Sequence, residues 1–497
     1  MIVVAASLES QSEMLSSAGD AMEDGWDRLR GRPIRRSLAL WRFFSVATWK
    51  TVRANRTDDD MVTNATAAWV RNGLLRLGPT MIKLGQVFSS RTDLLHPAYV
   101  TALTSLQTAV PSVSGARVRA LLEAELGVPL PYEQFCDEPI AGASLGQVHR
   151  AVFAGRPVAV KVQRAQLAEL FDTDFRNIRL MCRGLNMVER LRERVRRVRG
   201  RGRSAADRDW LQYADDAARL LYQEIDYENE GRNAEAFAAS LVGTGSRVVV
   251  PKVVWPATTK RVLTMDFIES VKLTDTEAVA TLRLDAKRLS QEVVDTFLLQ
   301  LLQTGVLHCD PHPGNLCVTP GGRLVLYDFG MMDTLTPTTV SGLRRLAFAL
   351  FGGSPAPSEA ELEQAGDQLM QGLQEAGFLA AGADELAVRK VGIFLVAYFK
   401  DQYAGRATQD IGEQIGAELQ GLLDQGYISF PSAFTFVGRA FTSVDGIARN
   451  LQPETYDFGR ACEPYVGRLI SEEYSSQART QIDEVLAKAR SWLGMPD

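Results

Sequence analysis

The spacing of hydrophobic positions changes along the first half of the chain. Residues 1 to about 137 and 165 to about 242 carry apolar residues mainly at helical spacing, as does most of the chain beyond Leu273. Between Ile140 and Lys161 apolar and polar positions follow the spacing of β-strands. The pattern therefore predicts a small group of strands set between helical segments.

The strand-like segment predicts a β-hairpin with a turn at residues 155–157. On its second strand, Val158 and Val160 are expected on one face and Lys161 on the other. A small mixed sheet followed by a larger helical part is typical of an α+β fold with two lobes and a cleft between them. A loop is expected at the Gly/Ser/Pro-rich segment 352–358. Further strands are expected at residues 247–255 and 261–268 and in a hairpin over 316–330.

Composition places the chain among ordinary globular proteins. Its 497 residues are 46% hydrophobic and 23% charged, and a formal net charge of −5 gives no case for a nucleic-acid-binding protein. The five cysteines form no CxxC pair, which favours a reducing compartment. No apolar run reaches the roughly 18 residues of a spanning helix, and the first residues lack the basic start of a signal peptide. A cytoplasmic protein is therefore expected.

Two basic segments raise the question of a membrane. Residues 28–56 contain nine Lys or Arg and no acidic residue, and six of these cations fall within an arc of about 160° on a helical wheel. Such a helix suits an anionic membrane interface, although a helix packed on its own domain explains the same pattern. The second run, 189–203, is expected to be a solvated face that ends in a loop at Gly200 and Gly202, with a lipid or partner site as the alternative. The six cations are Arg35, Arg36, Arg42, Lys50, Arg53 and Arg56.

Two features of the hairpin suit phosphate binding. A strand fixes the stem of Lys161 and aims its ammonium group, which favours pairing with phosphate oxygens. Small residues at 141–147 would let backbone N–H groups approach an anion closely, although a tight β-turn explains them equally well. These residues are Ala141, Gly142, Ala143, Ser144, Leu145, Gly146 and Gln147.

Four acidic side chains lie within residues 224–230. On one continuous helix, Glu224 and Glu228 would share a face, and Asp226 and Glu230 would share another. Like charges stacked in this way cost stability. The pattern therefore predicts cationic or metal partners elsewhere in the chain, or an acidic face in solvent.

The segment 308–315, His-Cys-Asp-Pro-His-Pro-Gly-Asn, has the spacing of a kinase catalytic loop. Asn315 follows Asp310 by five residues, and the Asp-Phe-Gly that begins at Asp328 follows it by eighteen. In protein kinases this pattern places one aspartate at the substrate hydroxyl, and an asparagine and a second aspartate at Mg²⁺. The order of small-residue loop, strand lysine, helical glutamate, catalytic loop and Asp-Phe-Gly agrees as well.

His308, Cys309 and His312 raise two other hypotheses. A transition-metal site would need a further His or Cys ligand, and His96 and His149 lie in unrelated contexts. A Cys–His nucleophile pair has no orienting partner in the sequence. We expect instead that the two histidines brace the loop by hydrogen bonds and that Cys309 is a packed, inert thiol.

Together these motifs resemble the UbiB/aarF-type family of atypical protein-kinase-like proteins. The resemblance covers about residues 75–465. It rests on K-L-G-Q at 83–86, A-G-A-S-L-G-Q-V-H-R-A at 141–151, V-A-V-K-V-Q from 158, E-I-D-Y-E-N-E from 224, H-C-D-P-H-P-G-N from 308, Y-D-F-G from 327 and G-R-A-F-T-S-V-D-G from 438.

The resemblance implies a kinase-like fold that binds ATP and Mg²⁺. Lys161 would contact the nucleotide phosphates and pair with Glu230. Asp310 would be the catalytic aspartate, and Asn315 and Asp328 would be the Mg²⁺ ligands. An alanine-rich loop would replace the usual glycine-rich one, through Ala141, Gly142, Ala143, Ser144, Gly146 and Gln147.

The resemblance also implies that a helix of the N-terminal extension lies over the active site, where a protein substrate normally docks. That helix would carry Lys83, Gly85 and Gln86, with Glu224 and Asp226 as its acidic partners. Lys83 would offset the repulsion among the carboxylates.

Two segments depart from the family pattern. Gly142 stands where the family usually has the middle of three alanines, which bears on nucleotide preference and turnover. Residues 265–270 read Met-Asp-Phe-Ile-Glu-Ser, with Asp266 and Ser270 where the family usually has Glu and Gly. This second departure bears on the hinge that would read the adenine.

The expected function is an Mg-ATP-binding ATPase that supports isoprenoid-quinone or related membrane-lipid metabolism. A true small-molecule or protein kinase and a non-catalytic, ATP-gated scaffold are the alternatives. Expected partners are ATP and anionic membrane lipids or a lipid or quinone biosynthetic complex, with no nucleic acid; the location is cytoplasmic, with peripheral attachment to a membrane. The expected parts are 1–74, basic and helical; 75–137, the helical extension; 138–270, the smaller lobe with a helical insert; 271–465, the larger lobe; and 466–497, a helical tail.

Overall fold

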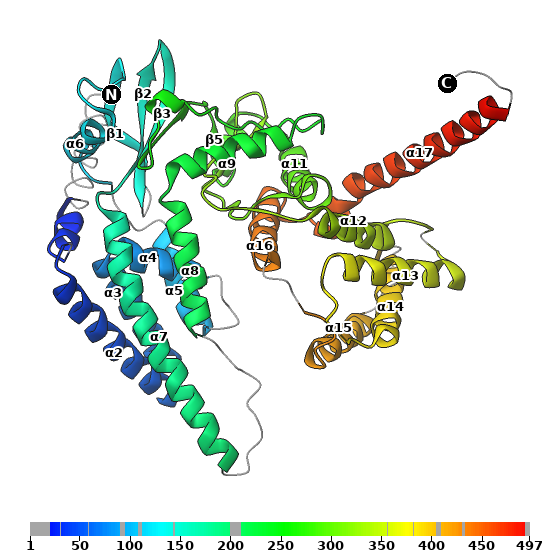
Figure 1. The fold of residues 1–497 in the computed structure, drawn as a ribbon, viewed down its shortest axis with the longest axis horizontal. Helices are drawn as coiled ribbons and strands as arrows, with labels where there is room; N and C mark the ends of the chain where they lie inside the picture. Colours follow the sequence, from blue (N-terminus) through cyan, green and yellow to red (C-terminus); the bar gives the residue numbers. More distant parts are fainter. Residues whose placement is uncertain are drawn as a thin grey trace. The chain divides into compact units, whose positions relative to one another are not determined.

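The computed structural model describes residues 20–29, 31–57, 59–89, 95–107, 112–142, 145–198, 210–354, 356–380, 382–403, 409–429 and 433–492. The chain has an α+β, two-lobed kinase-like fold, and it divides into two compact units (Figure 1). The first unit comprises Met1–Glu235, Pro251–Ile268 and Asp328–Met331, and the second comprises Ala236–Val250, Glu269–Tyr327 and Met332–Asp497.

The first unit combines a helical extension with a four-stranded antiparallel sheet of order β1-β2-β3-β4. Its strands are β1 (Gln134–Gly142), β2 (Gly146–Phe153), β3 (Arg156–Gln163) and β4 (Val262–Asp266). Its helices are residues 20–27, α2 (Pro33–Thr57), α3 (Asp60–Leu77), α4 (Pro79–Ser89), α5 (Pro97–Thr104), η1 (Ser105–Gln107), α6 (Gly115–Leu126), α7 (Leu167–Val198), α8 (Trp210–Glu224), α9 (Tyr227–Ser240), whose last residues belong to the second unit, and η2 (Trp255–Ala257).

The predicted hairpin is confirmed as β2 and β3, which pair from Phe153 and Arg156 up to Gly146 and Gln163. The turn lies at Ala154–Gly155, both of which have positive φ, as a tight hairpin turn requires. Val158 and Val160 are buried in a core that the sheet shares with α6. The strand predicted at 261–268 is confirmed in β4.

Two expectations about strands are wrong. The Val-rich segment 247–255 forms only isolated bridges at Val249 and Val253. The chain was expected to be mostly helical up to about residue 137, but strand β1 begins at Gln134. Most of its residues are exposed, so no apolar alternation marks it.

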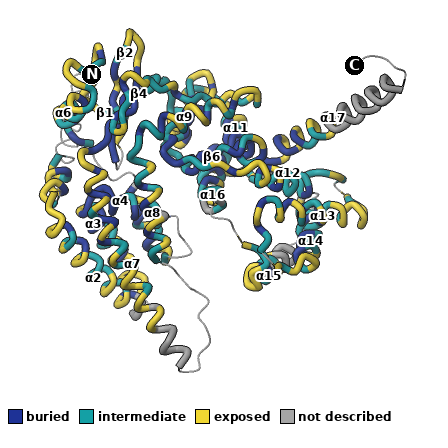
Figure 2. The backbone as a smooth tube through the Cα atoms, in the orientation of Figure 1, coloured by how far each residue is buried: buried dark blue, intermediate teal, exposed yellow. Residues whose placement is uncertain are grey.

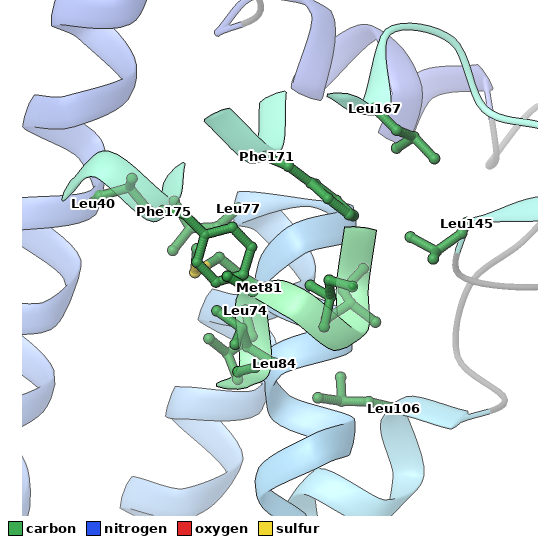
Figure 3. Close-up of a cluster of buried hydrophobic side chains, with 14 of the residues drawn as sticks. Leu40, Leu74, Leu77, Met81, Leu84, Leu106, Leu145, Leu167, Phe171 and Phe175 are labelled. Atoms are coloured by element: carbon green, nitrogen blue, oxygen red, sulfur yellow. The ribbon is translucent and has the colours of Figure 1, made fainter. Parts of the chain in front are cut away.

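The helical extension has a core of its own, shown in Figure 3, where α2, α3, α4, α7 and α8 contribute buried side chains. Phe171 and Phe175 of α7 lie among Leu40, Leu74 and Met81. The helix predicted in the basic segment is confirmed as α2, but Arg36 does not lie on a solvated or lipid-facing arc. It is 1% exposed and forms a bidentate ion pair with Asp174 of α7. The second basic run belongs to α7 as far as Val198, and Gly200 and Gly202 lie outside the described residues.

The second unit is mainly helical and holds two small sheets. Its strands are β5 (Val271–Lys272), β6 (Val306–His308), β7 (Leu316–Val318), β8 (Leu324–Leu326) and β9 (Met332–Thr334), in the orders β5-β7-β8 and β6-β9. Its helices are α10 (Thr276–Thr281), α11 (Ala286–Leu299), η3 (Gln300–Thr304), α12 (Pro337–Phe351), α13 (Glu359–Glu375), α14 (Glu385–Tyr403), α15 (Gln409–Asp424), α16 (Ala433–Leu451) and α17 (Phe458–Trp492).

The hairpin predicted over 316–330 is confirmed as β7 and β8, with Gly322 at positive φ in the turn. Of the predicted loop 352–358, the described residues 352–354 and 356–358 lie between α12 and α13, and α13 begins with a capping box at Ser358. Among the residues described here, no helix has both the length and the apolar character needed to cross a bilayer.

Candidate functional site

Lys161 of β3 contacts two carboxylates within the first unit. Its Nζ donates to both oxygens of Glu230, at 2.8 and 2.9 Å, and lies 3.4 Å from Oδ2 of Asp328. Strand β3 presents Lys161 on the face opposite Val158 and Val160, as predicted, and helix α9 supplies Glu230. The structure therefore brings together three of the residues that the sequence singled out.

Burial and charge act against each other at this cluster. Burial lowers the pKa of Lys161, but the carboxylates of Asp328 and Glu230 outweigh it, so that the pKa is raised above its ordinary value. Burial raises the pKa of Glu230 to about 7, against the attraction of Lys161. The ring of Tyr227 lies 4.9 Å from Lys161 Nζ and adds a cation–π contact. Lys161 is therefore a firmly held cation beside Asp328.

Asp328 adopts a backbone conformation that is unusual for a residue other than glycine. Its φ is +59°, and its Oδ1 accepts a hydrogen bond of 3.3 Å from the Gly330 N–H. Asn233 of α9 holds the same segment by donating from Nδ2 to the carbonyl of Phe329 at 2.9 Å. Strain of this kind persists where the surroundings impose it, and it concentrates at functional sites. Asp328 itself remains nearly half exposed, so that a ligand can reach it.

The small-residue loop joins β1 to β2. Ala141 pairs with Val148 and Gly142 pairs with Gln147, while Ala143 and Ser144 lie outside the described residues. A Cβ at Gly146 would lie 2.4 Å from the Val162 carbonyl oxygen and 2.8 Å from the Tyr227 hydroxyl, so glycine is required there for packing.

The side chain of Gln147 has a structural role. It is buried, accepts from the N–H of Val113 at 2.8 Å, and donates to the carbonyl of the same residue at 3.1 Å. Its Nε2 also lies 2.8 Å from Nε2 of His149. The side chain therefore anchors the segment before α6 to β2, which leaves the backbone of Gln147 as the part that could contact a nucleotide.

Among the residues of the extension, Lys83 of α4 forms an ion pair with Glu224. Gln86 donates instead to the carbonyl of Leu106 at 2.9 Å. A Cβ at Gly85 would lie 2.5 Å from a methyl carbon of Leu106, so this glycine permits close packing of α4. Of Lys83, Gly85 and Gln86, only Lys83 contacts one of the two acidic residues, Glu224 and Asp226, that were predicted as partners of this helix.

The prediction that Glu224 and Glu228 share a helical face is wrong. Helix α8 ends at Glu224, and α9 begins at Tyr227. Asp226 lies between them and accepts from the N–H of Asn229 at 3.0 Å, the hydrogen bond of an N-cap residue. Because a helix start separates Glu224 from Glu228, this pair escapes the i,i+4 repulsion of a single helix. Glu224 still acts on Glu230, whose pKa is raised mainly by burial and also by nearby carboxylates, that of Glu224 among them.

The second unit holds Asp310 and Asn315. Asn315 donates from Nδ2 to the carbonyl of Asp310 at 3.1 Å, and its own carbonyl accepts from the N–H of Tyr327 at 2.9 Å. This carbonyl contact ties the loop to the residue that immediately precedes Asp328. Arg439 of α16 pairs with Asp310, with 3.0 Å between Nη2 and Oδ1. The carboxylate of Asp310 is therefore held by a cation.

The histidines brace the loop, as expected. His308 is buried; its Nδ1 accepts from the N–H of Asp310 at 3.3 Å, and its Nε2 lies 3.3 Å from the carbonyl oxygen of Tyr327. His312 accepts from the N–H of Gly314 at 2.7 Å through Nδ1. Cys309 is 3% exposed, its Sγ lies 3.7 Å from the carbonyl oxygen of Leu307, and burial raises the pKa of its thiol to about 12, which argues against a role as nucleophile. Within the described ranges, no group of three or more His, Cys, Asp or Glu side chains is placed to hold a metal ion.

The donor atoms fit Mg²⁺ better than a transition metal. Asp328 offers a carboxylate, and Asn315 offers its Oδ1, because its Nδ2 is used by the Asp310 carbonyl. Mg²⁺ prefers oxygen ligands, and in nucleotide enzymes it commonly takes one or two protein groups, with phosphates and water completing its shell.

Three residues of the site were given no role from the sequence, although two of them, Tyr227 and Arg439, lie in segments that carry the family resemblance. Arg439 lies far from Asp310 along the chain, and no local pattern links them. Tyr227 and Asn233 flank Glu230 on α9 at helical spacing, which was a usable signal once Glu230 had been singled out. Each holds one of the predicted residues or its neighbour rather than adding a separate chemical group.

The site has the features of a protein-kinase-like protein: a lysine on a strand paired with a glutamate on a helix, an Asp and an Asn in one loop, and an Asp-Phe-Gly segment whose Asp has a positive φ. Residues 105–354 match the family model described as the ABC1 atypical kinase-like domain. The chain belongs to this family, the UbiB/ABC1 family, which confirms the resemblance seen in the sequence.

Several relatives cover most of the chain. Protein ACTIVITY OF BC1 COMPLEX KINASE 8, chloroplastic, of Arabidopsis thaliana is 34% identical in an alignment 486 residues long that covers 90% of this chain and 61% of that protein. Uncharacterized protein sll0095 of Synechocystis sp. is 32% identical over 95% of this chain and 80% of its own length. The chain thus spans less than two thirds of the first of these relatives.

One solved structure, that of Rv3197 with erythromycin from Mycobacterium tuberculosis, has a TM-score of 0.47 at 23% identity. It covers 74% of this chain and 87% of that chain. A likeness of this size carries no inference about ligands.

Proposed function

We propose that this protein binds Mg-ATP and hydrolyses it, in support of isoprenoid-quinone or related membrane-lipid metabolism. The observation that carries the nucleotide part is the contact of Lys161 with both Glu230 and Asp328 in the first unit. A partly buried lysine that two carboxylates hold in place, one of them accessible, is suited to binding phosphate oxygens beside a cation.

Each residue has a distinct role in this proposal. Lys161 binds the phosphates, and Glu230 orients Lys161. Asp310 orients the attacking water or hydroxyl, and Arg439 holds the carboxylate of Asp310. Asn315 and Asp328 would hold Mg²⁺, which supplies charge neutralisation at the phosphates when it is bound. The backbone of residues 141–147 would approach the phosphates.

The extension favours hydrolysis over phosphorylation of a separate protein. Lys83 is paired with Glu224, and a Cβ at Gly330 would lie 3.9 Å from Cγ of Glu224. The α4 helix is therefore linked through Glu224 to the Asp-Phe-Gly segment, beside which a kinase receives its acceptor. A kinase for a small acceptor is the second candidate, since it uses the same residues.

Phosphate release from ATP tests the proposal. The wild-type protein should release phosphate only with Mg²⁺, and Asp328→Asn should abolish the release while the protein stays folded. Equal release by Asp328→Asn would mean that a contaminant hydrolyses the ATP. Mg-ATP binding without release would leave the ATP-gated scaffold as the function, and transfer to a lipid or small hydroxyl acceptor would establish the kinase.

A further inference from the structure

An apolar stripe runs along the outer side of α2. Ile34, Leu38 and Trp49 are 77%, 66% and 59% exposed, and Trp41 and Val52 are also exposed. Successive positions are three, four or eight residues apart, which is one or two helical turns, so the five side chains lie in one line along the helix. Figure 2 shows exposed positions along α2. A line of large exposed apolar side chains on one face is unusual in a protein without a partner at that face.

A second stripe lies on α7. Leu180, Met187 and Leu191 are each more than half exposed and are again spaced by helical turns. Helices α2 and α7 lie side by side, because Arg36 pairs with Asp174 and Trp41 donates to Asn177 at 3.2 Å.

The two stripes face the same side. Arg36 contacts Asp174, and Trp41, further along α2, contacts Asn177, further along α7. The two helices therefore run parallel. Each helix buries its opposite face in the same core, α2 through Leu40 and α7 through Phe171 and Phe175. Because α2 and α7 are adjacent and bury one face each in the same core, the opposite faces of both helices, which carry the apolar stripes, point to the same side of the unit.

Arginines border the apolar stripes on both helices, and acids are scarce there. Helix α2 has no Asp or Glu over Pro33–Thr57, and α7 has none from 175 to 188. A surface with an apolar centre and cationic margins matches the headgroup region of an anionic bilayer, where apolar side chains enter the interface and arginines meet phosphates. The exposed arginines beside the stripes are Arg35, Arg42, Arg53, Arg176, Arg183 and Arg190.

We propose that this α2–α7 face docks the protein on an anionic phospholipid bilayer. The inference deepens the proposed function, because it names the surface by which a protein of membrane-lipid metabolism reaches its membrane. The charge pattern favours the bilayer over a second copy of the chain, since two copies of a face with many arginines and few acidic residues would repel each other. Docking in this way needs no spanning helix.

Vesicle sedimentation of the full chain tests the proposal. The protein should sediment with vesicles of phosphatidylcholine containing about 30% phosphatidylglycerol and remain in solution with phosphatidylcholine alone. The double variant Arg42→Glu/Arg53→Glu should lower the partition coefficient about thirtyfold or more, since each arginine near an anionic surface contributes about fivefold. The double variant Leu38→Ser/Trp49→Ser should also lose binding.

Two matched controls separate the face from general effects. Leu386→Ser removes a similarly exposed apolar side chain from α14, and Arg156→Glu reverses an exposed arginine at the start of β3. Both controls should bind vesicles like the wild type. All four variants should keep the Mg-ATP thermal shift, because none alters a residue of the nucleotide site.

Three results would overturn the proposal: no binding by the wild type, equal binding by the face variants, or equal loss in the controls. If light scattering shows an oligomer that Leu38→Ser/Trp49→Ser dissolves, and vesicles bind nothing, the face joins two copies instead. Because nucleotide binding is measured separately, failure of docking leaves the proposed function standing, and loss of the nucleotide response alone leaves docking standing.

Discussion

Replacing Arg36 by methionine should destabilise the first unit by about 3–5 kcal/mol. The pair that it forms with Asp174 is fully buried, with exposed fractions of 1% and 0%, and both of its N–O distances are 2.6 Å. Arg36 also donates from Nη1 to the carbonyl of Leu77 at the end of α3. Methionine keeps most of the volume but leaves Asp174 without its buried cation, and an uncompensated charge costs more than the packing regains.

Urea unfolding followed by tryptophan fluorescence measures this cost. Six of the seven tryptophans lie in the first unit, so that the signal reports mainly on it. Arg35→Met is the matched control, because Arg35 is the adjacent residue and is exposed; its effect should stay within about 0.5 kcal/mol. The double variant Arg36→Met/Asp174→Leu should recover most of the loss, because both charges are then absent.

Equal losses of unfolding free energy in Arg36→Met and Arg35→Met would show that the buried Arg36–Asp174 pair has no special contribution. A double variant no more stable than Arg36→Met alone would show that the loss comes from packing rather than from the charge left on Asp174.

Three further predictions concern the site. Lys83→Ala should raise autophosphorylation, because it frees α4 from Glu224, while lowering the free energy of unfolding by about 1 kcal/mol; unchanged autophosphorylation in a radiolabelled-ATP assay would argue against occlusion by the extension. Arg439→Ala should lower kcat for phosphate release by about ten- to a hundredfold with little change in KM, because Asp310 loses its orienting cation, and Arg439→Lys should recover part of it; an unchanged kcat would remove Arg439 from the mechanism. Glu230 binds its proton more tightly in the folded chain than its ordinary pKa of 4.5 allows, so the stability it contributes is complete below pH 4.5 and is lost as pH rises through about 7. Glu230→Gln should therefore remove up to about 3 kcal/mol of pH dependence from urea unfolding across that window, and parallel pH curves for the two proteins would contradict the assignment.

The parts of the fold that the sequence predicted are those with a strong local period. The alternation at 158–161 located β3 and the face of Lys161, and the spacing from Asp310 to Asp328 pointed to the kinase-like family to which the chain belongs. Strand β1 was missed because both of its faces are largely exposed, which removes the alternation. The end of α8 and the start of α9 around Asp226 could have been predicted, because an aspartate is a preferred N-cap residue. The four acidic residues were instead placed on one continuous helix.

The contacts that could not be predicted join residues far apart in the chain. Nothing near Arg36 distinguishes it from Arg35, yet one is buried against Asp174 and the other is exposed. The pairing of Arg439 with Asp310 likewise depends on where α16 packs, which no spacing along the chain encodes. The basic segment was recognised, but which of its cations face outward was decided by the tertiary packing of α2 on α7.

A calorimetric titration of the full chain with ATP measures whether the protein binds Mg-ATP through Lys161. We expect one site that binds ATP in the presence of Mg²⁺, and a loss of most of that affinity in Lys161→Met, with Arg156→Glu binding as the wild type does. Absence of Mg-dependent binding by the wild type, or equal affinity in Lys161→Met, would show that Lys161 and its carboxylates do not form a nucleotide site.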